Sequence, residues 1–473
     1  MNPRTKIICT IGPSVNRYSQ ILSLIDAGMN VARLNFSHGT HEEHLRAIDL
    51  IKKAREEKQV PLAIMLDTKG PEIRIGMVPG GGLDLVTGDI FYLTRPSQKK
   101  EKNQIILSPE NVFDCLKEGD TLLFDDGYIT ADVVEVTKEG VKLEVKNSGI
   151  LKNQKGVNIP GVKVPLPAMT QEDKDSISFG CFHDVDIIAA SFIRSEEHVL
   201  EIRRLLIENE KPEIFLISKI EDVQGVENFD RILAVSDGIM VARGDLGVEM
   251  PLQEVPNLQK KMIQSCYRQG KLVITATQML ESMIKNPRPT RAEVSDVANA
   301  IYDSTSAVML SGETAVGLYP IETVKMMRKI IMEAENHFLY KSFLDQEFKR
   351  ENVDVSASIA KAAVKTAYSI KAKAIVALTS SGFSACNVSQ FRPQMPILAL
   401  TANKKTYHQL ALSWGVIPIQ SPITANIRES FGYVVKYALE KQIIQKGDFL
   451  VMTAGEIFGV KGTTNMMIVE SVP

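Results

Sequence analysis

A lysine and a glutamate that could assist phosphoryl transfer lie two residues apart in segment 214–225, which reads I-F-L-I-S-K-I-E-D-V-Q-G. The apolar run before Lys219 is typical of a strand buried on both faces, and side chains at positions i and i+2 of a strand share a face. Lys219 and Glu221 are therefore expected together at the carboxyl end of this strand. A structural ion pair is one interpretation. The other is a divalent metal on Glu221 and a phosphorylated substrate beside Lys219, since buried charges need compensation.

Polar residues close several other predicted strands, and their types suit phosphoryl transfer. Glu221 and Asp245 suit a hard divalent ion such as Mg²⁺, which keeps waters and takes substrate oxygens. Arg33 and Arg74 suit phosphate, and Lys219 would place a point charge on the transferring group. A weakly charged site for a monovalent cation could be formed by Asn35, Ser37, Asp67 and Thr68. These parts match metal-assisted phosphoryl transfer, in which positioning and charge neutralisation supply most of the catalysis.

Two predicted strands carry pairs of candidate residues. Strand 238–245 would place Arg243 and Asp245 on one face, and strand 271–279 would place Thr275 and Thr277 on one face. The sequence contains neither G-x-x-x-x-G-K-[ST] nor G-x-G-x-x-G after a strand. A nucleotide would therefore be held through its phosphates and metal rather than by a P-loop.

Composition narrows the class of protein. The 473 residues are 44% hydrophobic and 24% charged, with a net charge of −2, which gives no support to nucleic acid or a membrane surface as a partner. Five scattered cysteines without a C-x-x-C motif indicate free thiols in a reducing compartment. The amino-terminal apolar stretch is too short for a signal peptide, and no apolar run could span a membrane. A cytoplasmic protein is expected.

The elements that must position these residues follow a strand–helix rhythm. The predicted strands are 5–12, 30–37, 62–67, 186–193, 213–221, 238–245, 271–279 and 306–314. The predicted helices are 14–28, 41–58, 196–209, 223–234, 252–269, 291–302 and 320–338. This rhythm predicts an α/β fold, a (β/α)₈ TIM barrel with its active site at the carboxyl ends of the strands. An open doubly wound sheet is the competing arrangement.

Two further domains are expected. Many glycines, short alternating segments and hairpin turns at 125–127 and 138–140 predict an inserted β domain over residues 71–164, after the third strand. The barrel would then comprise residues 1–70 and 165–340, and a separate α/β domain would comprise residues 341–473. In that last domain, T-S-S-G-F-S at 379–384 follows a predicted strand and opens a helix. It could be a phosphate cradle or merely a capped helix.

A series of motifs resembles the pyruvate kinase family essentially from end to end. The motifs, in order, are N-V-A-R-L-N-F-S-H-G, L-D-T-K-G-P-E-I-R, K-G-V-N-I-P-G, I-S-K-I-E, D-G-I-M-V-A-R-G-D-L-G-V-E, A-T-Q-M-L-E-S-M and S-G-E-T-A. The resemblance implies a TIM barrel, a β-barrel lid inserted after the third strand and a carboxyl-terminal α/β domain. It also implies transfer of phosphate from phosphoenolpyruvate to ADP, giving pyruvate and ATP.

The resemblance implies a role for each matching position. Glu221 and Asp245 would bind Mg²⁺ or Mn²⁺, and Lys219 would steady the phosphoryl group and the enolate. Together with the metal, Arg33, Arg74 and Lys219 would neutralise the moving phosphoryl group. The residues that would contact the substrate are Arg33, Lys219, Gly244, Asp245 and Thr277. Thr277 is also a candidate on the route of the proton to the enolate. K⁺ would be held by Asn35, Ser37, Asp67 and Thr68. The residues that would bind the nucleotide are Asn35, His38, Arg74 and Lys155. Glu72 is the residue type that accompanies K⁺ dependence in the family.

The same resemblance implies allosteric regulation and assembly. A phosphorylated small-molecule effector would bind Thr379, Ser380, Ser381, Gly382 and Ser384, together with the loop near 458–464, and a homotetramer is expected. The chain resembles a compact bacterial form without the extra carboxyl-terminal domain of some members. Two alternatives are an enolate-forming lyase or aldolase on a related barrel and a non-catalytic metabolite sensor.

Overall fold

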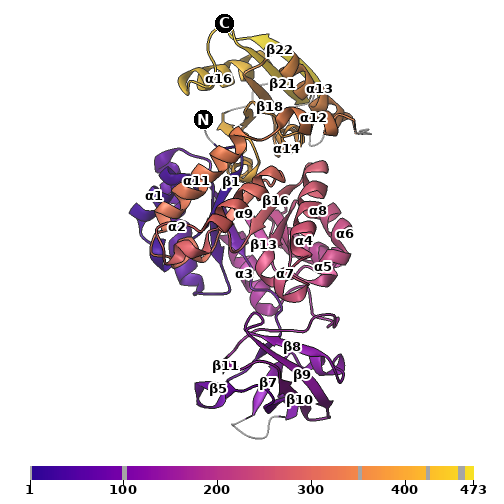
Figure 1. Ribbon diagram of the computed structural model, residues 1–473. Helices are drawn as coiled ribbons and strands as arrows, with labels where there is room; N and C mark the ends of the chain where they lie inside the picture. Colours follow the sequence, from indigo (N-terminus) through magenta and orange to yellow (C-terminus); the bar gives the residue numbers. More distant parts are fainter. Residues whose placement is uncertain (1–2, 99–103, 350–353, 422–426, 456–463) are drawn as a thin grey trace.

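Eight parallel strands close into a barrel in the computed structural model of the chain, which describes residues 3–98, 104–349, 354–421, 427–455 and 464–473 (Figure 1). The strands are β1 (Lys6–Thr10), β2 (Val31–Asn35), β3 (Ala63–Asp67), β13 (Ile187–Ala190), β14 (Phe215–Ile220), β15 (Gly238–Ala242), β16 (Leu272–Ala276) and β17 (Ala307–Leu310). Their order around the barrel is β1-β17-β16-β15-β14-β13-β3-β2, so the barrel prediction is confirmed and the open sheet is wrong.

Helices surround the barrel, and an apolar core fills the space between them and the strands. They are α1 (Tyr18–Ala27), α2 (His41–Lys58), α3 (Gln171–Phe182), α4 (Glu196–Glu208), α5 (Val223–Glu227), α6 (Phe229–Val235), α7 (Arg243–Glu249), α8 (Val255–Arg268), α9 (Arg291–Tyr302), α10 (Gly312–Ala315) and α11 (Pro320–Asn336). Helix α3 was not expected from the sequence, although Thr170 and Asp173 form a reciprocal capping box at its start.

The predicted strands 238–245 and 271–279 are too long. β15 ends at Ala242 and α7 begins at the next residue, so Arg243 and Asp245 lie on a helix and not on one face of a strand. β16 ends at Ala276, and Thr277 has a positive φ of 66°, which breaks the alternation that would have paired it with Thr275. The chain therefore turns at the carboxyl mouth of the barrel after each of these two strands.

A separate β domain follows β3 and lies at the lower end of the molecule in Figure 1. Its main sheet has the order β12-β8-β9-β10-β6-β7-β4, and β11 pairs with β5 beside it. The strands are β4 (Arg74–Ile75), β5 (Gly82–Leu85), β6 (Ile90–Thr94), β7 (Ile105–Ser108), β8 (Thr121–Phe124), β9 (Ile129–Val136), β10 (Gly140–Val145), β11 (Gly149–Lys152) and β12 (Val157–Asn158). The two expected hairpin turns connect β8 to β9 and β9 to β10. We call this domain the lid.

The carboxyl-terminal part forms a five-stranded sheet of order β20-β19-β18-β21-β22 at the opposite end of the barrel from the lid (Figure 1). Its strands are β18 (Ala374–Leu378), β19 (Ile397–Thr401), β20 (Val416–Gln420), β21 (Phe449–Gly455) and β22 (Thr464–Ser471). Its helices are α12 (Tyr340–Glu347), α13 (Val355–Ser369), α14 (Phe383–Ser389), α15 (Lys404–Gln409) and α16 (Ile427–Glu440).

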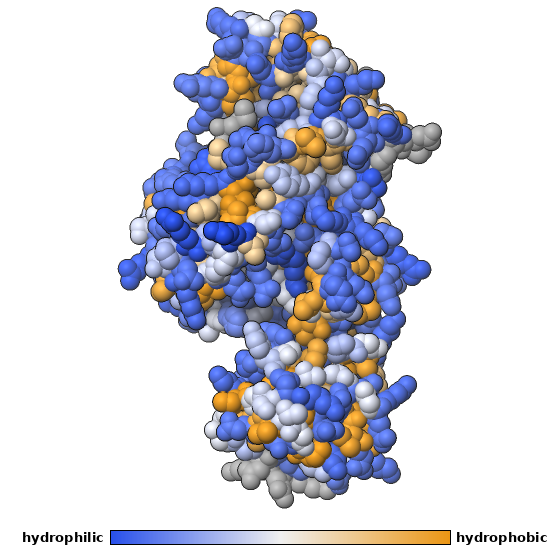
Figure 2. All heavy atoms as spheres, viewed as in Figure 1, coloured by the Kyte–Doolittle hydropathy of each residue, from blue (hydrophilic) through white to orange (hydrophobic). Residues whose placement is uncertain are grey.

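The surface is predominantly hydrophilic on the face shown in Figure 2, and a notch separates the barrel from the lid. None of the helices in the described ranges is long and apolar enough to cross a membrane.

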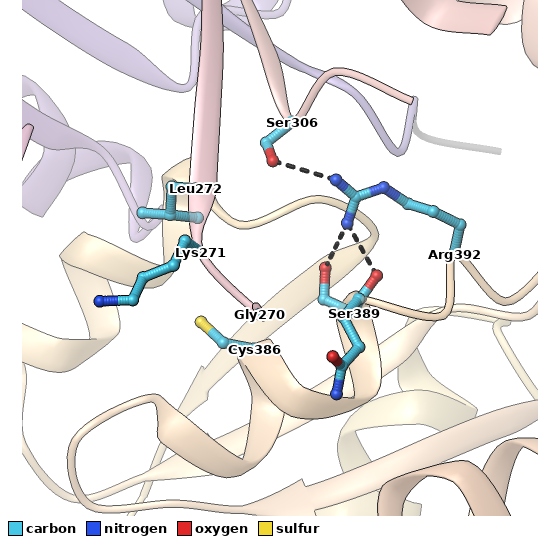
Figure 3. A pocket seen from close by; sticks show the side chains of 8 residues that line it. Gly270, Lys271, Leu272, Ser306, Cys386, Ser389 and Arg392 are labelled. Atoms are coloured by element: carbon cyan, nitrogen blue, oxygen red, sulfur yellow. Dashed lines mark hydrogen bonds between the residues drawn. The ribbon is translucent and has the colours of Figure 1, made fainter. Parts of the chain in front are cut away.

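The barrel and the carboxyl-terminal sheet meet at a buried interdomain seam at the amino ends of the barrel strands. Arg392 is 2% exposed and donates to the carbonyl of Ser304 at 2.9 Å and to the hydroxyl of Ser306 at 3.2 Å. Figure 3 shows Arg392 beside a small pocket between the two parts. Lys405 of α15 reaches back to the Asp184 carboxylate at 2.9 Å. The seam therefore ties the two domains through polar contacts, of which those of Arg392 are buried.

His408 makes the stability of this seam dependent on pH. Its Nδ1 accepts a hydrogen bond from the Leu62 amide at 3.4 Å. Burial, helped by nearby Arg55, Lys404 and Lys405, lowers the pKa of His408 to about 3, so the folded protein opposes its protonation. The pKa of this histidine in the unfolded chain is 6.5. Its contribution to the free energy of unfolding is therefore present above pH 6.5 and is lost as the pH falls from 6.5 towards 3.

We expect acidification to lower the thermal unfolding midpoint of the unchanged protein by several degrees more than that of His408→Gln. The measurement compares the two proteins at about pH 7.5 and about pH 5. His337→Gln is the control, because His337 is exposed beside Glu333 on the outside of the barrel. Equal acid sensitivity of the unchanged protein and His408→Gln would contradict the assignment.

Candidate active site

Lys219 lies at the centre of a buried cluster at the carboxyl mouth of the barrel. Its ammonium donates to Asp67 Oδ1 at 3.0 Å and to Ser191 Oγ at 2.7 Å, and it lies 3.0 Å from Glu221 Oε1. Arg33 completes the group, because its Nε donates to Asp67 Oδ2 at 2.6 Å. We call Arg33, Asp67, Ser191, Lys219 and Glu221 the Lys219 cluster. It joins the ends of β2, β3, β13 and β14 at one place.

The opposite charges in this cluster stabilise one another's ionised forms. Burial opposes the charge on Lys219, but the carboxylates of Asp67 and Glu221 outweigh it and raise the pKa of Lys219 above its usual value. Burial likewise opposes ionisation of Asp67, but Arg33 and Lys219 outweigh it and lower the pKa of that carboxyl. Lys219 is therefore a fixed cation and not a base that exchanges protons near neutral pH.

Asp245 adds a carboxylate whose ionisation is disfavoured. It is in the first turn of α7, and burial followed by repulsion from Glu221 raises its pKa to about 7. Two acidic groups that repel each other at the rim of a buried site fit a divalent cation, which would relieve the repulsion. Among the described residues, no group of three His, Cys, Asp or Glu side chains could hold a metal ion. A cation here would therefore rely on these two carboxylates together with substrate oxygens and water.

Arg243 and Asp245 have different surroundings, contrary to the prediction that they share a face. Arg243 turns away towards Asp296, with a hydrogen bond of 2.8 Å, and donates to the Thr277 carbonyl at 2.7 Å. Arg243 thereby supports the turn that follows β16. The Thr277 hydroxyl accepts from the Gly244 amide at 2.8 Å, so these two predicted substrate contacts lie together.

The four predicted monovalent-cation donors come from two adjacent strand ends. Asn35 and Asp67 are register partners at the ends of β2 and β3, and Ser37 and Thr68 follow them. Ser37 lies in the turn beyond β2, so it does not extend the strand as predicted, but its amide donates to Asn35 Oδ1 at 3.2 Å. Hydroxyl, amide and carboxylate oxygens with one formal negative charge among them fit a singly charged cation.

Residues of the lid and its hinge face the same mouth. Arg74 is paired with Glu72 and donates to the Gln154 carbonyl at 2.8 Å. Lys155 lies 2.7 Å from Asp125 at the β8–β9 turn. The neighbouring Asp126 contributes to the raised pKa of Asp245. This turn therefore lies close enough to the barrel mouth for its negative charge to act on Asp245. Asn158 of β12 also bonds Glu249 of α7 at 2.7 Å.

Other predicted residues lie outside the Lys219 cluster. The side chain of His38 is exposed, and its carbonyl contacts His44 Nε2 at 2.9 Å. In the carboxyl-terminal domain, the Thr379 hydroxyl accepts from the Gly382 amide at 2.9 Å, and the Ser384 hydroxyl lies 2.5 Å from that of Thr464. Ser380 and Ser381 are half-buried in the same turn. The loop near 458–464, apart from Thr464, is outside the described residues.

Sequence reasoning missed Ser191 and Thr10 as parts of the site. Ser191 follows the last residue of β13, and Thr10 accepts from Arg33 Nη1 at 3.0 Å. The signal was available in both cases, because each is a hydroxyl that closes an apolar strand at the same mouth as Lys219.

Comparison with known proteins agrees with this architecture. The family model described as pyruvate kinase, barrel domain, matches residues 2–324, and the model described as pyruvate kinase, alpha/beta domain, matches residues 357–470. A pyruvate kinase of Clostridium acetobutylicum is 46% identical over 470 residues, which cover 99% of both chains. Pyruvate kinases of Sporosarcina psychrophila and Geobacillus stearothermophilus are each 45% identical. Their alignments cover 99% and 100% of this chain and 80% and 81% of theirs.

These matches extend over both the barrel and the carboxyl-terminal sheet, at an identity well above that of a shared fold alone. The chain belongs to the pyruvate kinase family.

Proposed function

We propose that the pyruvate kinase activity of this chain takes place at the Lys219 cluster and Asp245. In that reaction the phosphoryl group of phosphoenolpyruvate passes to ADP and gives pyruvate and ATP. The observation that supports this location is the meeting of Lys219 with Asp67 and Glu221 at 3.0 Å, beside the Asp245 carboxylate, whose charge is disfavoured by burial and by Glu221. Phosphoryl transfer needs fixed positive charge and a metal ion on the phosphate oxygens. Arg33 and Lys219 supply the positive charge, and Glu221 and Asp245 would hold the metal.

Each residue of the site has a distinct task in this proposal. Arg33 and Lys219 would neutralise the oxygens of the moving phosphoryl group, held in place by Asp67. Gly244 and Thr277 would position the organic part of the substrate, with Thr277 also a candidate on the protonation route. Glu221 and Asp245 would hold Mg²⁺ or Mn²⁺, which supplies charge neutralisation to substrate oxygens.

The nucleotide would bind between the barrel and the lid. Arg74 and Lys155 supply positive charge from the hinge and the lid, and Asn35 lies at the end of β2. His38 is on the exposed rim, where it could meet the less buried part of a nucleotide. Lys155 would exchange its bond with Asp125 for a phosphate when the lid approaches the barrel.

Glu72 tests the K⁺ site, which we place at Asn35, Ser37, Asp67 and Thr68. Burial and the charge of Glu221 help raise the pKa of Glu72, although Arg74 opposes this, so Glu72 lies within the field of the site. A lysine at this position would bring its own positive charge into that field. We expect Glu72→Lys to weaken activation by K⁺, measured as the ratio of rates with K⁺ and with a large organic cation. An unchanged ratio would reject this role.

Regulation, assembly and location are proposals that rest on the family. The turn at Thr379, Ser380, Ser381, Gly382 and Ser384 would bind a phosphorylated effector. The chain would form homotetramers in the cytoplasm. We also propose the domain boundaries 1–70 with 165–340, 71–164 and 341–473.

A coupled assay with phosphoenolpyruvate and ADP, with and without K⁺, tests the activity. Production of both pyruvate and ATP in equal amounts is expected. Pyruvate with inorganic phosphate and no ATP would mean that the phosphoryl group passes to water and not to ADP, which would contradict the proposal. Consumption of phosphoenolpyruvate without pyruvate would indicate a lyase or aldolase, and binding without turnover would indicate a metabolite sensor.

A further inference from the structure

Ser191 occupies the position between Lys219 and β3. Its side chain is buried, with 3% of the residue exposed. The hydroxyl accepts from Lys219 Nζ at 2.7 Å and donates to the Thr68 carbonyl at 2.6 Å. The amide of Ser191 donates to Thr68 Oγ1 at 3.1 Å. Ser191 therefore bonds to both the catalytic lysine and a residue of the proposed K⁺ site.

The hydrogen bonds of Lys219 give this contact its importance. An ammonium has three N–H donors, and Lys219 has three acceptors within 3.0 Å, namely Asp67, Glu221 and Ser191. Two of these carry charge, Asp67 at the end of β3 and Glu221 directly after β14. The Ser191 hydroxyl is the neutral third contact that fixes the direction of the ammonium between them.

Phe192, the residue after Ser191, holds Glu221, the carboxylate proposed to bind the metal. Phe192 has a positive φ of 54°, a strained conformation for a residue with a side chain, and its amide donates to Glu221 Oε2. Arg194 holds this turn, because its guanidinium lies 2.7 Å from Asp222 next to Glu221. One turn after β13 thus holds Lys219 by a side chain and Glu221 by the backbone.

Close packing fixes this turn against β3. Gly70 has a positive φ of 78°, and a Cβ added there would lie 2.7 Å from the Ser191 Cβ. The turn therefore cannot shift towards β3, and the Ser191 hydroxyl is held at a defined place.

We propose that Ser191 is a positioning residue whose hydroxyl orients the Lys219 ammonium and couples it to the K⁺ site through the Thr68 carbonyl. This inference rests on the proposed function of the Lys219 cluster. Displacement of a catalytic charge by about 1 Å can reduce turnover by about 100-fold.

The test compares Ser191→Ala with Ser191→Cys and with Ser218→Ala in the full chain. Ser218→Ala is the matched control, because Ser218 is also buried and precedes Lys219, but its hydroxyl bonds Ser236 at 2.7 Å instead of the Lys219 cluster. The readouts are kcat, KM for phosphoenolpyruvate, the K⁺ concentration for half-activation, the thermal unfolding midpoint, and Mn²⁺ affinity without substrate.

For Ser191→Ala we expect kcat to fall about 10- to 100-fold while KM for phosphoenolpyruvate stays within about threefold. The K⁺ concentration for half-activation should rise. Mn²⁺ affinity should stay the same, because the Phe192 amide and not the Ser191 hydroxyl holds Glu221. Ser191→Cys should recover part of kcat, and Ser218→Ala should match the unchanged protein in kcat and K⁺ response.

The inference is overturned if Ser191→Ala keeps kcat and K⁺ activation within about twofold of the unchanged protein, or if Ser218→Ala loses as much. Should Ser191→Ala fail to fold, Ser191→Cys decides by the same two readouts. An inactive unchanged protein would instead refute the proposed function, so the two failures are distinguishable.

Discussion

Lys219→Met is expected to reduce kcat by at least about 1,000-fold, because preorganised charge at the transferring group is the largest catalytic term in such a site. Lys219 is held at 3.0 Å by both Asp67 and Glu221, and burial leaves little room for water to replace its charge. Methionine fills the same volume without the ammonium. The measurement is the steady-state rate with saturating phosphoenolpyruvate, ADP, Mg²⁺ and K⁺.

Lys271→Met is the control for a lost lysine on the barrel. Lys271 precedes β16 at the other mouth, where its ammonium donates to the carbonyls of Ala234 and Ser236. Its substitution should leave kcat within about threefold while affecting stability. Circular dichroism checks that both variants fold, and near-normal turnover in a folded Lys219→Met would remove Lys219 from the mechanism.

Glu221→Gln is expected to weaken Mn²⁺ binding by at least about tenfold and to lower kcat/KM by about 100- to 10,000-fold. The amide keeps the size of the side chain and can still accept from the Phe192 amide, but it removes the charge that would bind the metal. Mn²⁺ binding is followed by electron paramagnetic resonance without substrate, and the rate is measured separately at high Mg²⁺.

Glu249→Gln provides the matched control in the same region. Glu249 ends α7, the helix that carries Asp245, and it accepts from Asn158 of the lid at 2.7 Å. A glutamine there can keep that bond, so Mn²⁺ affinity should be unchanged. Similar losses in Glu221→Gln and Glu249→Gln would show a general charge effect and not ligation by Glu221.

Much of the Lys219 cluster could be predicted from local pattern. The apolar run before Lys219 indicated a buried strand, and the spacing to Glu221 placed both charges at its end. Pairing of β2 with β3 aligns Asn35 with Asp67, and Arg33, which shares a strand face with Asn35, reaches the same carboxylate.

The positions of the other candidate residues depended on the residue at which each strand ends. Nothing in A-R-G-D-L-G-V-E indicates a helix that starts at Arg243, because its two glycines lower helix propensity. Arg243 and Asp245 were therefore expected on one face of a strand, whereas on the helix their side chains point to different surroundings. Local pattern could place Ser191 at the end of its strand, but not its contact with Lys219, since that contact depends on a tight turn packed against Gly70, more than 100 residues away in the chain.

The most direct test of the central claim is a double-mutant cycle for Mn²⁺ affinity with Glu221→Gln, Asp245→Asn and the double variant, measured without substrate. If the two carboxylates hold one ion beside Lys219, the unchanged protein binds one Mn²⁺ per chain and each single variant loses affinity. The double variant should then lose less than the sum of the two single losses in free energy. Strictly additive losses, or an Asp245→Asn variant that binds Mn²⁺ as tightly as the unchanged protein, would contradict the shared site.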